Sequence, residues 1–191
     1  MTEPPKWGND DDYVDWIARD LYTRTNRVNK SFKNIWGGIF HEDGKGASAY
    51  YDASGLTGAT PDGRKDRDLF NDGTVSPQIG TDRKGPVATL KSVSKIDHAG
   101  TFTHLFNQKY TPQEVQKNNG SNFISVLRTF VDLGIHHVQF NVINKEKLLE
   151  AQMHPEKYSD LVVRTAGLAA YFVDLTKPVQ DQIIARTELS L

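Results

Sequence analysis

The sequence predicts an α/β protein. From residue 121 onward, predicted segments follow in the order helix, strand, helix, strand, loop, strand, helix, which is typical of the α/β class. A chain of 191 residues suffices for one domain, or for one domain with an appendage. Hydrophobic residues make up 37% of the chain and 15 residues are glycine. We therefore expect long loops beside a core of modest size.

The N-terminal part is predicted to hold one helix followed by a long irregular segment. Asn9 to Asp12 offer helix caps and first-turn acids, and Tyr13, Ile17 and Leu21 then recur at helical spacing, so we expect a helix over about residues 10–30. Residues 34–83 contain nine glycines and no helical period; Ala47 to Tyr51 is a strand candidate there. A loop of this length is typical of a binding loop or of a surface that lies against a partner.

Shorter elements are predicted from residue 85 to residue 134. A helix resumes near Gly85, Phe102 to Tyr110 alternates like a strand, and a short helix follows Thr111 and Pro112. Asn118 to Gly120 predict a turn, after which Ser121 or Asn122 can cap the next helix. That helix repeats apolar residues at positions 123, 126, 127, 130 and 131 and ends at Gly134.

The C-terminal elements carry the α/β alternation. The pattern predicts strands at His137–Ile143, Leu161–Val163 and Ala169–Leu175, and a helix at Lys145–Met153. The last two strands surround Ala166 and Gly167. A final helix is expected after Thr176, with Pro178 in its first turn.

Composition and charge exclude several classes of function. The 23 basic residues balance 24 acidic ones, so no overall field recruits nucleic acid or an anionic membrane. The longest apolar run, Ala166 to Val173, is far shorter than the roughly 18 residues of a membrane span. Residues 1–12 have neither the basic region nor the apolar region of a secretion signal. The absence of cysteine excludes disulfides, thiolate metal sites and a thiol nucleophile supplied by this chain.

Several local patterns favour structural interpretations. The six histidines show no metal-ligand spacing, and Asn9 to Asp15 lacks the glycine and the final glutamate of a calcium loop. We therefore predict no metal site and interpret the acidic stretch as helix capping. Gly44 to Ser48 lacks the strand and helix of a phosphate-binding loop. The mixed charges of Asp62 to Asp68 are typical of a solvated surface.

Gly167 is the unusual residue, because it interrupts an otherwise strong strand pattern between small neighbours. One interpretation is a bulge or a tight loop where two backbones approach each other. A second interpretation is chemical: a glycine α-carbon has no side chain forcing it out of plane, so an unpaired electron there is delocalised onto the flanking amide and carbonyl. The residues alone leave both interpretations open.

The sequence around Gly167 resembles the C-terminal part of the glycyl radical enzymes, which include pyruvate formate-lyase and the choline, glycerol and arylacetate lyases. Their signature is an Arg-Val-x-Gly-Tyr/Phe loop, a strand, a helix containing glutamine and a terminal Arg-Thr. This chain reads DLVVRTAGLAAYFVDLTKPVQDQIIARTE from residue 160. Upstream segments also match in family order: KWGNDDDYVD, LTGATPDGRK, DRKGPVATLKSVSKIDH, LFNQKY and HVQFNV. The resemblance covers nearly the whole chain. These segments resemble the eliminase and decarboxylase branch of the family more than pyruvate formate-lyase itself.

The resemblance implies a fold, a division of the chain and a radical residue. The fold is the C-terminal part of an α/β barrel, not a complete barrel by itself. Residues 1–110 would be a barrel-completing segment, and residues 111–191 the glycine radical domain with its radical loop at 164–168. Gly167 would carry the radical, and Arg164, Ala166 and Arg186 would support the loop or anchor substrate. For the two arginines, a structural salt bridge is the alternative. Thr165 and Leu168 replace a usual valine and aromatic residue, which affects the packing of the loop and the lifetime of the radical.

The resemblance also implies partners. In the family a cysteine becomes the thiyl radical that attacks substrate, and this chain has no cysteine. We therefore expect the radical-bearing small subunit of a split lyase, inactive without a large subunit that carries the cysteine. A radical-SAM activase with S-adenosylmethionine and an iron–sulfur cluster would generate the radical, in the cytoplasm of an anaerobic organism. The alternatives are a spare part that replaces the oxygen-cleaved glycyl radical domain of a full-length homologue, or an excised fragment of a longer enzyme. The small substrate is not specified by this chain.

Overall fold

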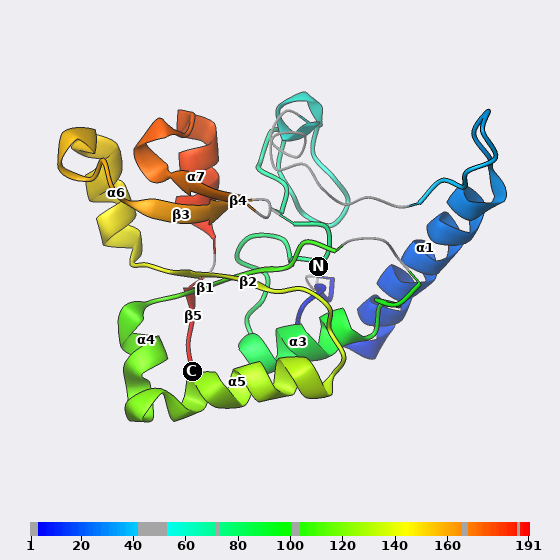
Figure 1. The fold of residues 1–191 in the computed structure, drawn as a ribbon, viewed down its shortest axis with the longest axis horizontal. Coiled ribbons are helices and arrows are strands. Elements are labelled where there is room, and N and C mark those ends of the chain that lie inside the picture. The colour runs from blue at the N-terminus through cyan, green and yellow to red at the C-terminus, as the bar shows by residue number, and fades with distance from the viewer. Residues whose placement is uncertain (1–3, 42–52, 72, 101–103, 166–167, 187) are drawn as a thin grey trace.

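The structure is a computed structural model that describes residues 4–41, 53–71, 73–100, 104–165, 168–186 and 188–191. Two expectations, the strand at Ala47–Tyr51 and the loop at Gly44–Ser48, lie outside these residues. Figure 1 shows a small central sheet with helices on either side of it and one long helix that extends away from the rest.

The central sheet has three parallel strands in the order β2-β1-β5. The middle strand β1 (Asn107–Tyr110) pairs residue by residue with β2 (Gln139–Val142), and its last two residues pair with β5 (Glu188–Leu189). Parallel neighbours need a crossover connection, and α4 (Pro112–Gln116) and α5 (Ser121–Asp132) supply it between β1 and β2. Within the described residues, the strands expected at 102–110 and 137–143 are shorter than predicted, and residues 102 and 103 of the first lie outside those residues.

A separate antiparallel hairpin contains the radical motif. Strand β3 (Val162–Thr165) pairs with β4 (Leu168–Tyr171), with Val162 opposite Tyr171 and Thr165 opposite Leu168. The strand expected at Ala169–Leu175 is confirmed as far as Tyr171. Its C-terminal end is wrong, because the chain turns into the 3-10 helix Phe172–Asp174 and the Leu175 amide bonds to the Phe172 carbonyl.

Four further helices lie close to their predicted positions. They are α1 (Asp12–Ser31), α3 (Pro86–Ser94), α6 (Lys145–Met153) and α7 (Lys177–Ala185). The expected caps of α5 are wrong: neither Ser121 nor Asn122 caps it, because Gly120 holds the N-cap position at a φ of 79°. Asn118 and Asn119 also have positive φ angles, so the chain reverses there through left-handed residues, as asparagine and glycine allow.

The structure has two hydrophobic clusters. In Figure 1, α3 and α5 lie on one side of the central sheet and α6 and α7 on the other. The first cluster includes residues of α3 and α5 and consists of Val75, Leu90, Val93, Ile96, Phe106, Val126 and Ile135. The other joins α6 and α7 to the hairpin through Ile143, Leu148, Ala151, Val163, Phe172, Ile183 and Ile184. The first cluster combines residues from before and after residue 110. The division into a barrel-completing segment (1–110) and a glycine radical domain (111–191) stays a prediction.

In helix α1 the buried residues are polar and most of its apolar side chains are exposed. Its buried residues are the polar Asp15 and Asn26, whereas apolar side chains at positions 13, 16, 17, 21 and 28 are exposed. The exposure continues beyond the helix to Phe40 and includes Trp36, which is 85% exposed. We call these apolar side chains of residues 13–40 the exposed apolar segment. Figure 1 shows α1 leading away from the sheet.

The sheets of the described part of the chain do not close into a barrel, in agreement with the expectation of an incomplete barrel. Across the same residues, no helix has both the length and the apolar character needed to cross a membrane.

Candidate radical site and its surroundings

Gly167 and Ala166 lie outside the described residues, but the strands before and after them are paired. Arg164 stands opposite Ala169 and Thr165 opposite Leu168 in the β3–β4 ladder. The hairpin therefore fixes the two chain segments that lead into and out of the proposed radical position. The roles predicted for Gly167 and Ala166 stay predictions.

The backbone of Arg164 is held by a side chain from the central sheet. Asn141 of β2 donates from Nδ2 to the Arg164 carbonyl over 2.9 Å, and its Oδ1 accepts from the Arg164 amide over 2.8 Å. Asn141 itself is 4% exposed. The amide side chain thus makes the two bonds that a neighbouring strand would make, and it ties the hairpin to the sheet.

The Arg164 side chain is exposed, and its charge acts on His137. Burial, followed by the positive charge of Arg164, lowers the pKa of His137 below its ordinary value. His137 Nδ1 accepts from the Phe106 amide over 3.3 Å. A guanidinium on the surface beside the hairpin is available to an anionic group, which is compatible with the predicted anchoring role.

Arg186 occupies a different position, at the C-cap of α7. It is buried and lines a very small hollow together with Asn107, Gln108 and Lys109. Arg164 is therefore a surface residue of the hairpin, whereas Arg186 belongs to the interior beside β1. Their predicted roles in supporting the loop or anchoring substrate stay predictions.

The central strand is polar although it is fully buried. Lys109 has no exposed surface; its Nζ lies 3.3 Å from the Ile184 carbonyl and 3.2 Å from Glu188 Oε1. Burial lowers the pKa of Lys109, and the Glu188 carboxylate opposes that shift. Tyr110 donates its hydroxyl to Gln108 Oε1 over 2.9 Å. Lys109 therefore anchors the end of α7 and strand β5, both of which follow Gly167 in the chain.

Gln180 fixes α7 to the segment that follows β4. Its Nε2 donates to the carbonyls of Phe172 and Leu175 over 3.0 and 3.1 Å. Gln180 is the glutamine of the predicted family signature, and the structure gives it this definite bonding role. Together with Asn141 and Lys109, it fixes the hairpin and α7 through polar contacts.

The fold brings together two histidines that their spacing did not connect. His98 Nδ1 and His104 Nδ1 lie 3.0 Å apart, and His98 Nε2 lies 2.9 Å from the Val93 carbonyl. A carbonyl only accepts, so His98 carries its proton on Nε2 and accepts from His104 on Nδ1. Burial lowers the pKa of His98, and it lowers the pKa of His104 to about 4 with help from His98. The pair is therefore neutral and shares one hydrogen bond.

Three N-terminal carboxylates gather around one ammonium group. Lys95 Nζ lies 3.0 Å from Asp10, 2.7 Å from Asp12 and 2.7 Å from Asp15. These carboxylates are close enough together to suit a cation, and Lys95 supplies it. Asp11 caps α1 by accepting from the Tyr13 amide, so the capping interpretation of the acidic stretch is confirmed for this residue.

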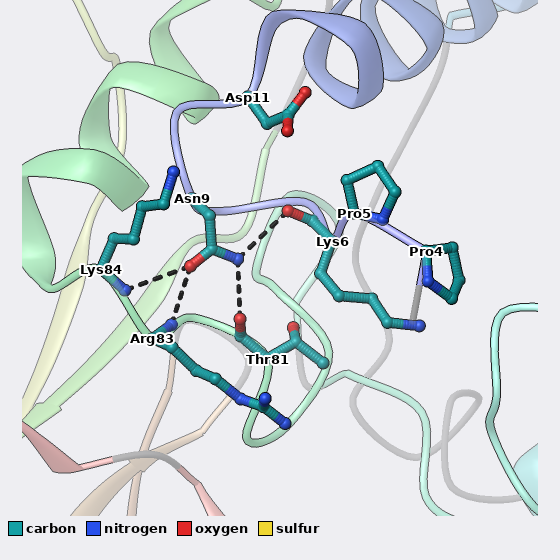
Figure 2. Close-up of a pocket in the computed structure, with 8 residues that line it drawn as sticks. All are labelled: Pro4, Pro5, Lys6, Asn9, Asp11, Thr81, Arg83 and Lys84. Atoms are coloured by element: carbon teal, nitrogen blue, oxygen red, sulfur yellow. Dashed lines mark hydrogen bonds between the residues drawn. The ribbon is translucent and has the colours of Figure 1, made fainter. Parts of the chain in front are cut away.

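A surface hollow of about 250 Å³ lies where the N-terminal segment meets residues 81–84 (Figure 2). Asn9 organises it: Nδ2 donates to the carbonyls of Lys6 and Thr81, while Oδ1 accepts from the Arg83 and Lys84 amides. This junction attaches the start of the chain to the segment before α3.

The charge run at 62–68 differs in part from the solvated surface that was expected. Arg64 is 7% exposed, and its guanidinium donates to the carbonyls of Thr57, Gly58 and Asp68 and lies 4.5 Å from the centre of the Phe70 ring. Because five guanidinium donors can satisfy several carbonyls at once, this one arginine organises a segment that has little regular structure.

The functional side chains that sequence reasoning missed are Asn141, Lys109 and the pair His98–His104. Lys109 lies in the matched segment LFNQKY, whose uninterrupted polar run within a strand pattern was a signal of buried hydrogen bonding. Asn141 lies in the matched segment HVQFNV, which carries no such signal. No local signal connected the two histidines, because only the tertiary fold brings their rings together.

Comparison with known proteins identifies the family of this chain. The family described as "Glycine radical" matches residues 71–173. The chain is 38% identical to trans-4-hydroxy-L-proline dehydratase of Clostridioides difficile over 98% of its own length and 24% of the relative's. It is 40% identical to indoleacetate decarboxylase of Tractidigestivibacter scatoligenes over 96% of its length and 21% of the relative's.

Solved structures show the same fold. The B12-independent glycerol dehydratase of Clostridium butyricum superposes with a TM-score of 0.90 at 46% identity, covering 98% of this chain and 24% of that one. The chain thus spans about a quarter of the length of the relatives it matches. The family match includes the β3–β4 hairpin and position 167. The chain therefore belongs to the glycine radical family, and it corresponds to the C-terminal glycyl radical domain of glycyl radical enzymes.

Proposed function

We propose that this chain is the radical-bearing part of a glycyl radical lyase, with the radical on Gly167 and the catalytic cysteine on a separate, larger polypeptide. The family match over residues 71–173 carries the proposal. Because none of the 191 residues is a cysteine, the thiyl radical of the proposed reaction has to form outside them. Arg164, Ala166 and Arg186 support the radical loop or anchor an anionic substrate group.

The radical transfer balances as a single hydrogen-atom exchange. An activating enzyme that uses S-adenosylmethionine and an iron–sulfur cluster removes one hydrogen atom from the Gly167 α-carbon. That carbon then takes a hydrogen atom, with its one electron, from the S–H bond of the partner's cysteine. The carbon regains its C–H bond and the sulfur retains one unpaired electron. The thiyl radical starts cleavage of a C–C or C–heteroatom bond in a small substrate.

The exposed apolar segment supports the existence of a large partner. Trp36 and Ile35 are 85% and 86% exposed, and they belong to a continuous stretch of sequence rich in exposed apolar side chains. Large exposed apolar surfaces mark protein interfaces. The part of each relative that this chain does not match is about three to four times as long as the chain itself, and a polypeptide of that size is large enough to cover the exposed apolar segment.

The relatives indicate the class of reaction. Their names include a dehydratase, a decarboxylase and a sulfite-lyase, all of which release a small group from a small substrate. We propose a reaction of this type, whose substrate is selected chiefly by the larger polypeptide.

Electron paramagnetic resonance tests the radical. After anaerobic activation with the matching activase in the presence of the large partner, we expect a doublet, because one hydrogen remains on the Gly167 α-carbon. Gly167→Ala should abolish the signal, since the added methyl group disfavours the planar radical. Gly55→Ala is the matched control, because a methyl group there meets nothing within 4 Å. An undiminished signal in Gly167→Ala would assign the radical to another residue.

Co-purification distinguishes the split enzyme from the spare part. A split enzyme requires a stable complex with a cysteine-bearing polypeptide that lacks its own glycyl radical domain. Restored activity of a full-length homologue that oxygen has cleaved, with no such truncated partner present, would instead identify a spare part.

A further inference from the structure

Strand β3 has one edge that does not pair with β4. The backbone groups on that edge show which residue outside the radical motif holds the strand in place. In an antiparallel pair, residues alternate between those that bond the partner strand and those whose amide and carbonyl both point away from it. The Phe172 amide donates to the Leu161 carbonyl over 2.7 Å. Counting in twos from that bonded pair places Val163 and Thr165 in bonded positions and Arg164 in an outward-pointing one.

Asn141 satisfies both outward groups of Arg164. Its carboxamide offers one donor and one acceptor at 2.9 and 2.8 Å, and it therefore behaves as a neighbouring strand one residue long. The contact is buried on the Asn141 side, where the side chain is 4% exposed. Water does not replace a lost partner easily in such a place, so both backbone groups depend on this one side chain.

The same position connects the hairpin to the rest of the site. Asn141 is the register partner of Lys109, and Lys109 reaches Ile184 and Glu188 on the far side of Gly167 in the chain. Adjacent residues of two paired strands thus hold the segment before Gly167 and the segment after it. Arg164 lies three residues before Gly167, so a shift of its backbone is transmitted along a short strand.

We propose that Asn141 is a positioning residue for the glycyl radical: its carboxamide fixes β3 at Arg164 and thereby sets the distance between Gly167 and the partner's cysteine. The proposal rests on the proposed function. It assigns no chemical step to Asn141, which acts only through the backbone of Arg164.

Amide hydrogen exchange in the full chain tests the contact without any partner. Asn141→Leu keeps the branched shape and the number of side-chain heavy atoms but removes both bonds, and we expect the Arg164 amide to exchange at least about tenfold faster. Asn141→Asp retains the acceptor for the Arg164 amide, and we expect that amide to remain protected. Val142→Ala is the control, because Val142 is the next residue of β2 and its side chain is exposed.

Two other amides report whether the fold survives. The Phe172 amide reports the hairpin and the Ile143 amide, which donates to the Tyr110 carbonyl, reports the sheet. We expect both to stay protected in Asn141→Leu. Unchanged exchange of Arg164 in that variant would overturn the proposal. So would equal loss of protection at all three amides in both Asn141→Leu and Asn141→Asp, which would make Asn141 a general stability residue.

Turnover per spin separates positioning from folding in the activated complex. A structural defect lowers the amount of competent protein, whereas misplacement of Gly167 lowers turnover for each radical formed. We expect Asn141→Leu to lose at least about tenfold in turnover per spin, or to form no radical, and Asn141→Asp to fall between it and the native chain. Native spin yield and native turnover per spin in Asn141→Leu would contradict the proposal. If the native chain itself forms no radical, the proposed function fails, while the exchange experiment still decides the contact.

Discussion

The hairpin region and helix α1 bury opposite kinds of side chain. Around the hairpin, apolar residues such as Phe172 and Ile183 form a closed cluster with almost no exposed surface. Helix α1 instead buries Asp15 and Asn26 and exposes its tryptophan, isoleucine and leucine. The hairpin region thus has a hydrophobic core of its own, whereas α1 is attached by polar contacts and presents its apolar face outward. The comparison indicates that the proposed large partner would cover the apolar face of α1.

The largest effect on the free energy of unfolding is expected from removing a large side chain from the hydrophobic cluster at the hairpin. Phe172 is fully buried, and Phe172→Ala should lower the free energy of unfolding by about 3–5 kcal/mol, through lost burial and the cavity left behind. Urea denaturation measures it. Tyr171→Ala is the matched control, because Tyr171 is the preceding residue and 50% exposed; we expect less than about 1 kcal/mol. Equal losses would show that the cluster is not the core of this region.

Acid should lower the free energy of unfolding through the pair His98–His104. The unfolded chain takes up a proton near the ordinary histidine pKa of 6.5, whereas folded His104 does so only at about 4. The stability that the neutral pair supplies is complete above pH 6.5 and is lost as the pH falls toward 4, by up to about 3 kcal/mol for His104. His104→Phe should flatten the profile in that interval. Parallel profiles for both proteins would contradict the assignment.

The polar attachment of α1 should depend on one buried charge. Asp15 accepts from Ser92 and from Lys95 and has no exposed surface. Asp15→Asn keeps its size and should lower the free energy of unfolding by about 1–2 kcal/mol, because Lys95 retains two other carboxylates. Asp12→Asn changes the same charge at a side chain that is 77% exposed and should cost at most about 0.5 kcal/mol. Thermal denaturation compares the two.

The smallest effect on stability is expected on the exposed face of α1. Ile17→Ser with Leu21→Ser should change the free energy of unfolding of the chain alone by no more than about 0.5 kcal/mol per site, since both side chains are exposed. The same variant should bind the large partner at least about tenfold more weakly. Thr25→Ala on the same helix is the control. Native affinity in the double variant would place the interface elsewhere.

Helices were predictable from sequence because their apolar period or their capping residues are local. The predicted bounds of Lys145–Met153 coincide with α6, and the helix expected at about 10–30 is α1 at Asp12–Ser31. The period of α1 also identified its apolar face, but a period does not say whether that face points inward. Only the packed structure shows that it points outward.

Strands and polar contacts were less predictable because their causes lie elsewhere in the chain. The strand predicted at 102–110 contracts to β1, whose buried residues are mostly polar and satisfied by distant groups such as the Ile184 carbonyl. The bonds of Asn141 to Arg164 span 23 positions, and no local pattern indicates them. The radical motif was found through family resemblance, which the match over 71–173 confirms, while glycine alone left a structural interpretation open.

Strand β5 and helix α7 follow Gly167 in the chain, yet both are integral to the fold. Residues 168–191 contribute an edge strand beside β1 and the side chains of Ile183 and Ile184 to the second cluster. A backbone break at Gly167 would therefore divide the molecule into two pieces that remain associated, as in fragment complementation. If oxygen destroys the proposed radical by cutting the backbone at Gly167, residues 168–191 should stay bound under native conditions and separate only when the protein is denatured.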